Sequence, residues 1–242
     1  MGTFDKHLFH PSGIGSLMSN KQGKKDTTCL EELGETARKE LQKIWIEATY
    51  GRRKEIDSKF IDKGNLEEES TITLYSRVKK KFFKKNEVTV SNEYFIGTPD
   101  SFTGEEIMKA EEIQDFKTSW DIFTFHESKF GPLDKGYEYQ LNCYQDITST
   151  RTARLIYGLV DTPLRLIEDE KRRLAWKMGL IDPHIDPLYK KRAELIDLCM
   201  VYPDIPMEKR IHEITIPYNS ELVGSVKKRV PIWREYLNTL DK

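Results

Sequence analysis

The sequence has little cysteine, no long hydrophobic run and no excess of charge of one sign. Its three cysteines, Cys29, Cys143 and Cys199, are widely spaced and form no C-x-x-C pair, which predicts reduced thiols rather than a zinc site or an iron-sulfur cluster. No segment approaches the roughly 20 apolar residues of a membrane span. The first residues also lack the apolar core of a secretion signal. We therefore expect a cytoplasmic protein without membrane contact.

Acidic and basic residues nearly cancel. Lysine and arginine number 39 and aspartate and glutamate 40, for a formal net charge of −1. This balance gives no global attraction to nucleic acid, so any such affinity must come from local basic patches. Hydrophobic residues at 38% and charged residues at 33% are typical of a globular protein with a polar surface. With neither an internal repeat nor a low-complexity linker, we expect a single domain over residues 1–242.

The most informative stretch lies in the middle of the chain. Residues 93–98 are rich in β-formers, Pro99 and Asp100 stop that pattern, residues 101–104 have the composition of a turn, and residues 111–118 resume an extended pattern. This arrangement predicts two strands flanking a turn, with the Asp100 carboxylate where the first strand ends.

Asp115 and Lys117 should project side by side from the second strand, because side chains alternate between the two faces of a strand. Burying them together costs stability unless they are paired, hydrated or bound to an ion. Mg²⁺, or Mn²⁺ in its place, would account for the arrangement, since such ions take a few carboxylate oxygens and keep several waters. The nearby ammonium could hold a water or neutralise charge on a phosphate. An ordinary Asp/Lys pair on a surface hairpin is the alternative interpretation.

Four short segments, taken together, resemble the PD-(D/E)XK nuclease superfamily, in its RecB-type and phage lambda-exonuclease-like (YqaJ-like) branch. The signature itself is matched by G-T-P-D at residues 97–100 and by I-Q-D-F-K at residues 113–117. Residues 63–68, K-G-N-L-E-E, are similar to the G-x-x-x-E element of that branch, and residues 140–144, Q-L-N-C-Y, match its Q-x-x-x-Y motif. The segments follow the order of the family within residues 63–146.

The resemblance implies an α/β fold with a restriction-endonuclease-like core, which is a mixed central β-sheet flanked by helices. It implies that one or two metal ions are held by Glu68, Asp100, Asp115 and the main-chain carbonyl of Phe116. Lys117 would position the attacking water, while Gln140 and Tyr144 would orient the substrate strand. The register of the first ligand leaves Glu67 and Glu69 as substitutes. RecB-type relatives that carry an iron-sulfur cluster hold it with several cysteines, and this chain has too few.

The activity implied by the resemblance is metal-dependent exonuclease digestion of linear duplex DNA, in phage or bacterial recombination and repair. The resemblance also implies a ring-like homotrimer and a single-strand annealing protein as partner. Two alternatives remain open. One is a structure-specific or restriction-like endonuclease of the same fold, which would not require DNA ends. The other is a non-cleaving DNA-binding recombination accessory protein, although such a protein has no need of the acid and lysine grouping.

Two further segments are candidates for DNA contact. Residues 1–26 are weakly patterned and are expected to be weakly structured; there the resemblance places Ser12 and Ser16 near the DNA end, and a capped surface helix is the alternative. The basic run from Lys79 to Lys85 could border the active-site groove, or could be a solvated face. Its lysines are Lys79, Lys80, Lys81, Lys84 and Lys85.

The remaining pattern predicts an alternation of helices and strands, with residues 150–242 as an extension of the same domain. Apolar spacing and capping residues predict helices at 30–50, capped by Thr27 or Thr28, and at 65–83, 137–147, 164–178, 188–200 and 220–240, the last interrupted at Pro231. Strands are predicted at 88–90, 153–161 and 211–217.

Overall fold

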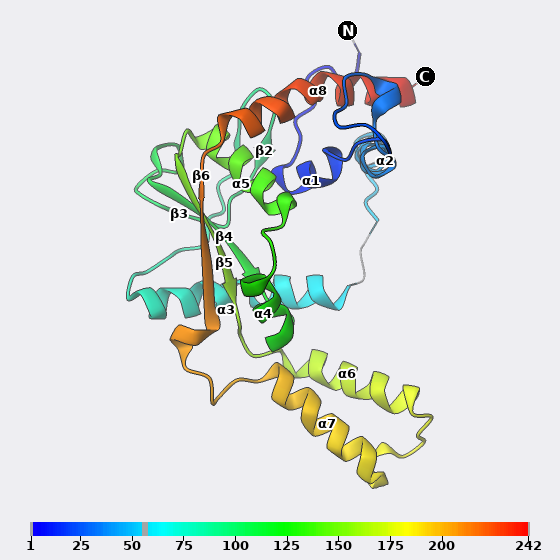
Figure 1. Cartoon of the computed structure of the whole chain (residues 1–242), viewed down its shortest axis with the longest axis vertical. Helices are drawn as coiled ribbons and strands as arrows, with labels where there is room; N and C mark the ends of the chain where they lie inside the picture. The colour runs from blue at the N-terminus through cyan, green and yellow to red at the C-terminus, as the bar shows by residue number, and fades with distance from the viewer. Residues whose placement is uncertain (1, 55–57, 242) are drawn as a thin grey trace.

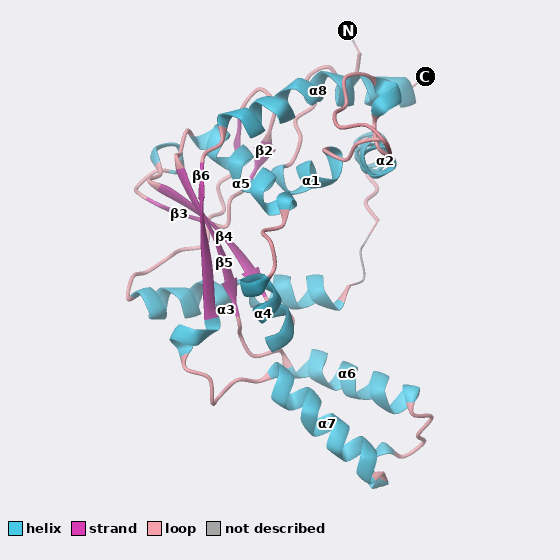
Figure 2. Cartoon of the chain, viewed as in Figure 1, coloured by secondary structure: helices cyan, strands magenta, loops and turns pink. Residues whose placement is uncertain are grey.

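The computed structural model describes residues 2–54 and 58–241; residues 1, 55–57 and 242 of the expected domain lie outside them. Helices surround one central sheet (Figures 1 and 2). The helices are α1 (Ile14–Leu17), α2 (Glu35–Tyr50), α3 (Lys59–Lys79), α4 (Ile122–Phe130), α5 (Lys135–Thr148), α6 (Leu164–Lys177), α7 (Pro187–Met200) and α8 (Ser220–Leu240). The strands are β1 (Val90–Ser91), β2 (Ile96–Gly97), β3 (Ser101–Thr103), β4 (Glu112–Thr118), β5 (Thr152–Gly158) and β6 (Ile211–Pro217).

The central sheet is mixed, with the strand order β3-β4-β5-β6. β4 and β5 are parallel, and the chain between them crosses over through α4 and α5, as a parallel connection requires. The outer pairs, β3 with β4 and β5 with β6, are antiparallel, and β1 pairs with β2 in a separate ribbon. A mixed sheet flanked by helices is the predicted fold class, which is therefore confirmed.

Helices cover both faces of the sheet, and the alternation of side chains decides what each face contains. Ile113 and Leu155 point toward Leu141 of α5 in the main hydrophobic core. On the opposite face, Phe116 and Ile156 pack with α3, through a second cluster that includes Ile72, Tyr75 and Phe83. Asp115 and Lys117 alternate with Phe116, so they lie on the α5 face.

Residues 4–17 pack into the core, so the expectation of a weakly structured segment over residues 1–26 is wrong for this part of it. Phe9 and Ile14 are fully buried, and Phe9 forms a bridge with Phe95 beside β2. The Phe9 ring also lies 5.1 Å from that of Trp233 in α8. Burial of these apolar side chains fixes a segment whose sequence has little local periodicity.

Other expectations about elements also need correction. Residues 101–104 were expected to turn, but Ser101–Thr103 forms β3 because it pairs with Glu112–Gln114. The helix predicted from residue 30 starts only at Glu35, since Gly34 is extended at its N-cap, and neither Thr27 nor Thr28 caps it. Pro231 does not interrupt α8, whose buried stripe of Val230, Trp233 and Leu237 continues past it.

The helix predicted at 65–83 is displaced toward the N-terminus and runs over Lys59–Lys79. Its early start has a tertiary cause. The fully buried Lys63 donates hydrogen bonds from Nζ to the carbonyls of Trp120 at 2.9 Å and Val160 at 3.0 Å, which ties the first turns of α3 to the chain after β4 and β5. Its end comes at Lys80, which adopts a left-handed conformation with φ of 52°.

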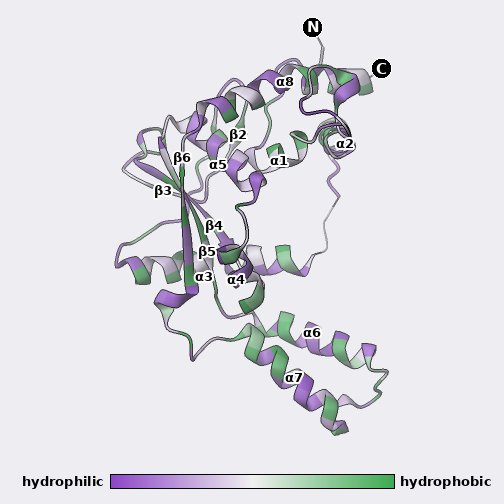
Figure 3. Cartoon of the chain, viewed as in Figure 1, coloured by the Kyte–Doolittle hydropathy of each residue, from purple (hydrophilic) through white to green (hydrophobic). Residues whose placement is uncertain are grey.

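Helices α6 and α7 form a hairpin that extends away from the sheet (Figure 1). Its base packs through Leu166, Ile167 and Met200 against Trp120. Hydrophobic segments are visible along both helices beyond the base (Figure 3). Among residues 2–54 and 58–241, no helix is both long and apolar enough to cross a bilayer.

Candidate active site

The candidate site lies at the edge of β4, where β3 leaves it. The pairing of β3 with β4 ends at Ser101 and Gln114, so in the described chain no strand covers that side of residues 115–118. Asp100 takes the place of the missing strand, because its Oδ2 accepts a 2.7 Å hydrogen bond from the main-chain N–H of Phe116. In a strand the N–H and C=O of one residue face the same side. The Phe116 carbonyl therefore points to the same open edge.

Asn86 fixes the segment that carries Asp100. Its main-chain N–H donates to the Asp100 carbonyl at 2.7 Å, and its side-chain Nδ2 donates to the Pro99 carbonyl at 2.9 Å. Asn86 Oδ1 in turn accepts from the Val88 N–H at 3.0 Å. The sequence analysis missed this residue, because an asparagine in a loop gives no local sign of a partner 13 residues away.

Asp115 and Lys117 lie side by side, as predicted, and Gln140 of α5 joins them on the same face. Lys117 Nζ lies 2.7 Å from Asp115 Oδ2, and Gln140 Nε2 donates to Asp115 Oδ1 at 2.8 Å. Asp115 is 1% exposed. Apart from the Lys117 ion pair, no group in the described residues donates a hydrogen bond to its Oδ2. The site therefore holds a buried carboxylate oxygen that has room for one more positive partner.

The two aspartates repel each other. Burial, reinforced by the Asp115 carboxylate, raises the pKa of Asp100 from 3.8 to about 8, against the opposing effect of Lys117. Burial alone would lower the pKa of the Lys117 ammonium, but the Asp115 and Asp100 carboxylates raise it above its usual range. A cation between the two aspartates would relieve this repulsion, since a nearby positive charge favours the ionised carboxylate.

Glu68 reaches toward this site from α3 but is held by a lysine. Its Oε1 lies 3.0 Å from Nζ of Lys85, and its charge contributes to the raised pKa of Asp100. Within residues 2–54 and 58–241, no three side chains of His, Cys, Asp or Glu are already grouped as metal ligands. The structure thus brings Asp100, Asp115 and Lys117 together and leaves Glu68 near them, paired with Lys85.

The donor set fits a hard divalent cation. It offers two repelling carboxylates, a buried Asp115 oxygen without a hydrogen-bond donor, and the Phe116 carbonyl at the same edge. Mg²⁺ takes a few such oxygens and keeps several waters, so it does not need a complete cage of side chains. Glu68 could complete the set by exchanging Lys85 for the ion.

Similarity to solved structures agrees with this geometry. The chain superimposes on a phage-related exonuclease from Haemophilus somnus 129PT with a TM-score of 0.73 and 23% identity, over 97% of this chain and 95% of that one. It also matches the alkaline exonuclease LHK-Exo from Laribacter hongkongensis, with a TM-score of 0.61 and 10% identity, over 98% and 90% of the two chains. A complex of LHK-Exo with dAMP gives a TM-score of 0.60 and 11% identity. The chain has the fold of these exonucleases.

No protein-family model and no curated protein matches the chain. The fold expected from the four sequence segments is confirmed, because these solved exonucleases share it over nearly the whole chain. The roles assigned to individual residues stay predictions, since identities of 10% to 23% establish the fold alone.

Helix α5 presents one face of side chains to the site. Gln140 contacts Asp115, and one turn later the Tyr144 hydroxyl donates to the Thr98 carbonyl at 3.3 Å. Gly97 lets Tyr144 approach, because a Cβ at Gly97 would lie 2.9 Å from the tyrosine ring. One turn before Gln140, the ring of Tyr137 lies 4.8 Å from Lys117 Nζ. The sequence analysis missed Tyr137, although its i, i+3 spacing to Gln140 puts both on one face of the predicted helix.

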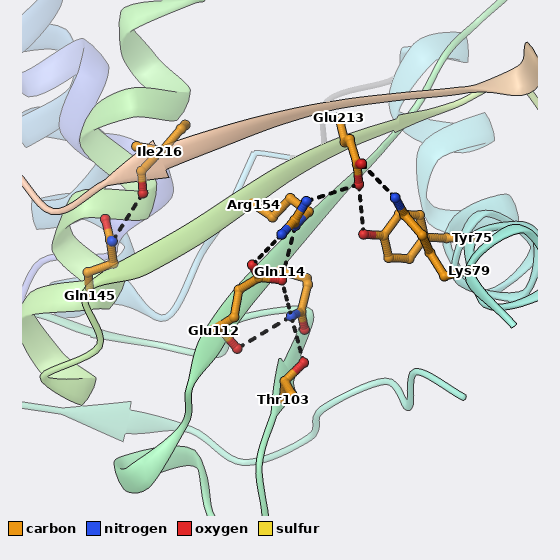
Figure 4. Close-up of polar contacts among 9 residues, drawn as sticks. All are labelled: Tyr75, Lys79, Thr103, Glu112, Gln114, Gln145, Arg154, Glu213 and Ile216. Carbon is orange, nitrogen blue, oxygen red and sulfur yellow. Dashed lines mark hydrogen bonds and ion pairs between the residues drawn. The ribbon is translucent and has the colours of Figure 1, made fainter. Parts of the chain in front are cut away.

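A polar network on the other face of the sheet holds α3, the helix that also carries Glu68; Figure 4 shows the network. Glu213 of β6 accepts hydrogen bonds from the Tyr75 hydroxyl at 2.9 Å and from Lys79 Nζ at 2.6 Å.

Arg154 of β5 joins Glu213 to β4, with Nη1 3.3 Å from Glu213 and Nη2 2.7 Å from Glu112. Gln114 and Thr103 extend the network to β3. Every strand of the central sheet therefore contributes to the position of α3.

The candidate DNA contacts fall into three groups. Ser12 and Ser16 are exposed and line a cavity of about 470 Å³ together with Lys135 and Gln140, which connects them to the site. Two lysines of the basic run are already paired, Lys79 with Glu213 and Lys85 with Glu68. The other three are exposed and carry no ion pair within the described chain; they are Lys80, Lys81 and Lys84.

Proposed function

We propose that this protein is a divalent-metal-dependent exonuclease that hydrolyses phosphodiester bonds of linear duplex DNA. The observation that carries the proposal is the grouping of Asp100, Asp115 and Lys117 at the open edge of β4, in a fold shared with exonucleases. The grouping supports hydrolysis because it combines the Asp100 and Asp115 carboxylates with the Lys117 ammonium and a strand edge that no other described strand covers.

Each residue of the site has a role that its contacts support. Asp100, Asp115 and the Phe116 carbonyl would hold Mg²⁺, with Mn²⁺ as a substitute and Glu68 as a further ligand. When bound, the ion lowers the pKa of an attacking water. Lys117 positions that water and neutralises charge on the phosphate.

Gln140 orients Asp115 through its 2.8 Å hydrogen bond to Oδ1. The other oxygen, Oδ2, is the one that pairs with Lys117. Tyr144 packs beside Gly97 and Thr98, the residues that precede Pro99 and Asp100. Gln140 and Tyr144 thus lie next to the site. From this position they would also orient the substrate strand. The cavity beside Ser12, Ser16 and Lys135 would accept the phosphates of the DNA end.

The proposal is tested by incubating the protein and Mg²⁺ with linear duplex and with covalently closed circular DNA. We expect loss of the linear DNA only. Lys117→Ala should reduce this activity by about 100-fold or more, as expected when a group that stabilises transition-state charge is removed. Cutting of the circle would identify an endonuclease instead. Binding without cutting of either substrate, with folded protein and Mn²⁺ also tried, would favour the accessory-protein alternative.

We further propose that the protein acts in the cytoplasm as a homo-oligomer, in a ring of the kind the resemblance implies, with a single-strand annealing protein as partner. The α6–α7 hairpin supports the oligomer, since it exposes large apolar side chains: Trp176 is 83% exposed and Leu198 71%. Such residues on a projecting element are typical of an interaction surface. Light scattering should give a multiple of the 28.4 kDa chain mass, reduced to one chain by Trp176→Glu with Leu198→Glu. A monomeric unmodified protein would contradict this assembly.

A further inference from the structure

Three neighbouring strands place Lys117, Tyr157 and His212 in one row across the sheet. Lys117 of β4 is the register partner of Tyr157 in β5, and Tyr157 is the partner of His212 in β6. Directly paired residues point to the same face of a sheet. The row therefore lies on the α5 face, beginning at the lysine of the candidate active site.

The aromatic rings in and beside this row lie next to one another across the sheet. The Tyr157 and His212 rings stack with centroids 6.0 Å apart and an interplanar angle of 18°. Tyr137 of α5 stands edge-on to Tyr157 at 6.3 Å and 71°. All three side chains are half-buried rather than enclosed. We call Tyr137, Tyr157 and His212 the aromatic strip.

The aromatic strip is uncharged and lies between two ammonium groups. Burial raises the pKa of both tyrosines and lowers the pKa of His212, so the rings are neutral at physiological pH. Lys117 lies at one end, and the charge of Lys129 in α4 acts on His212 at the other. Asp134, whose charge acts on both tyrosines, caps α5 by accepting a hydrogen bond from the Gly136 N–H, and the charge of Glu213 acts on His212.

The tyrosine hydroxyls of the strip are open to a ligand. Both side chains are half-buried, and neither hydroxyl is among the buried polar atoms that lack a partner. Tyr75 and Tyr202 differ, because each is buried and its hydroxyl donates within the fold, to Glu213 and to the Cys199 carbonyl. Half-buried rings with accessible hydroxyls suit a ligand that stacks and accepts hydrogen bonds.

We propose that the aromatic strip binds an unpaired nucleotide of the DNA strand whose phosphate reaches Lys117. This inference rests on the proposed function and extends it to a base-stacking site. The ligand is an unpaired nucleotide because its base has a free face that can stack on the rings. Bases inside a duplex are stacked on one another, so their faces are not free. Stacking on aromatic rings tolerates any base, and cations at both ends suit the flanking phosphates.

The test measures binding without cleavage. Fluorescence anisotropy in EDTA would follow a fluorescein-labelled oligodeoxythymidine binding to the full chain and to variants. Tyr157→Leu and His212→Leu should each weaken binding by about tenfold, the scale of one lost stacking contact. Tyr157→Phe and His212→Phe keep a ring, so they should stay within about twofold. Tyr50→Leu, which removes an exposed tyrosine at the end of α2, is the matched control and should leave binding unchanged.

The outcomes separate a stacking site from a packing role. If the leucine variants are folded but bind the oligonucleotide as the unmodified protein does, the aromatic strip does not bind bases. If binding of a closed circular duplex falls by the same factor, the loss is general and the inference also fails. Should Tyr157→Leu not fold, His212→Leu on the outer strand β6 decides alone. A protein that binds through the strip yet cuts no DNA would refute the proposed function and leave this inference standing.

Discussion

Lys85 Nζ lies 3.0 Å from Oε1 of Glu68, so the basic run neutralises the acid that the motif assigns to the metal. The same ammonium is influenced by Asp100, which places it at the rim of the site. A lysine in this position competes with a metal ion for Glu68. It is also free to move to a phosphate when DNA arrives, which would release the carboxylate as substrate binds.

Removal of this lysine should therefore strengthen metal binding in the absence of DNA. We expect Lys85→Ala to bind Mg²⁺ about two- to fivefold more tightly, as measured by isothermal titration calorimetry, because a partly exposed ion pair contributes modestly. Lys84→Ala removes an adjacent exposed lysine and should change nothing. Unchanged Mg²⁺ affinity in both Lys85→Ala and Glu68→Gln would move the third ligand to Glu67, Glu69 or another residue.

Asp100 should make the metal-free protein less stable as the pH rises. Its pKa is raised in the folded protein from 3.8 to about 8, so the folded state holds the proton more tightly than the unfolded chain. The resulting stabilisation is complete below pH 3.8, declines as the pH rises from 3.8 to about 8, and is lost above about pH 8. Urea unfolding in EDTA across that range measures it.

Asp100→Asn should remove this part of the pH dependence, because the amide does not titrate. Asp204→Asn, at an exposed loop position, should keep it. If the Asp100→Asn protein and the unmodified protein lose stability in parallel as the pH rises, then the Asp100 proton is not the cause.

Asn86 is expected to affect catalysis through the position of Asp100. Asn86→Ala removes the hydrogen bond to Pro99, so cleavage should fall by about tenfold while the free energy of unfolding falls by about 1 to 3 kcal/mol. Asn92→Ala is a matched control, because Asn92 also bonds nearby main-chain groups, those of Tyr94 and Phe95, but away from the site. It should cost similar stability with little loss of specific activity. Equal losses of activity would mean that Asn86 acts only through stability.

Gly158 at the end of β5 allows α3 to approach the sheet. A Cβ there would overlap the Thr71 side chain, which itself bonds Thr118 of β4 at 2.8 Å. Gly158→Ala should lower the free energy of unfolding by about 1 to 3 kcal/mol, as overpacking does. Gly224→Ala in α8 meets no atom within 4 Å and should be neutral or stabilising by up to about 1 kcal/mol. Thermal unfolding of the two variants compares them directly, and equal melting temperatures would contradict the close packing of α3.

Elements with a strong local signal were predictable. The strand at β4 and the helix at α5 were found within two residues, since β-forming residues and helical apolar spacing mark them locally. The segment at β3 was missed because three residues with turn composition become a strand only through pairing with β4. The start of α3 was missed because it depends on Lys63 reaching carbonyls far along the chain.

The site residues also divide into those with a local sequence signal and those that depend on tertiary contacts. Asp100, Asp115, Lys117 and Gln140 were predicted as site residues because their types and spacing follow a motif. In the structure Asp115 contacts Lys117 and Gln140, and Asp100 accepts from the Phe116 N–H between Asp115 and Lys117. The pairing of Glu68 with Lys85 was not predictable, because it depends on how the chain turns after α3 ends at Lys79. Asn86 was likewise hidden, since its partners are defined only by the fold.

The open side of β4 also bears on solubility. A strand edge with unpaired main-chain groups invites another chain to add to the sheet, which is a common start of aggregation. Here the Asp100 carboxylate accepts the hydrogen bond of the Phe116 N–H, which no described neighbouring strand pairs with, and charged Asp115 and Lys117 flank it. The same acids that would serve hydrolysis thus keep this edge from acting as a template for a foreign strand, so variants that neutralise them should be screened for self-association as well as for lost activity.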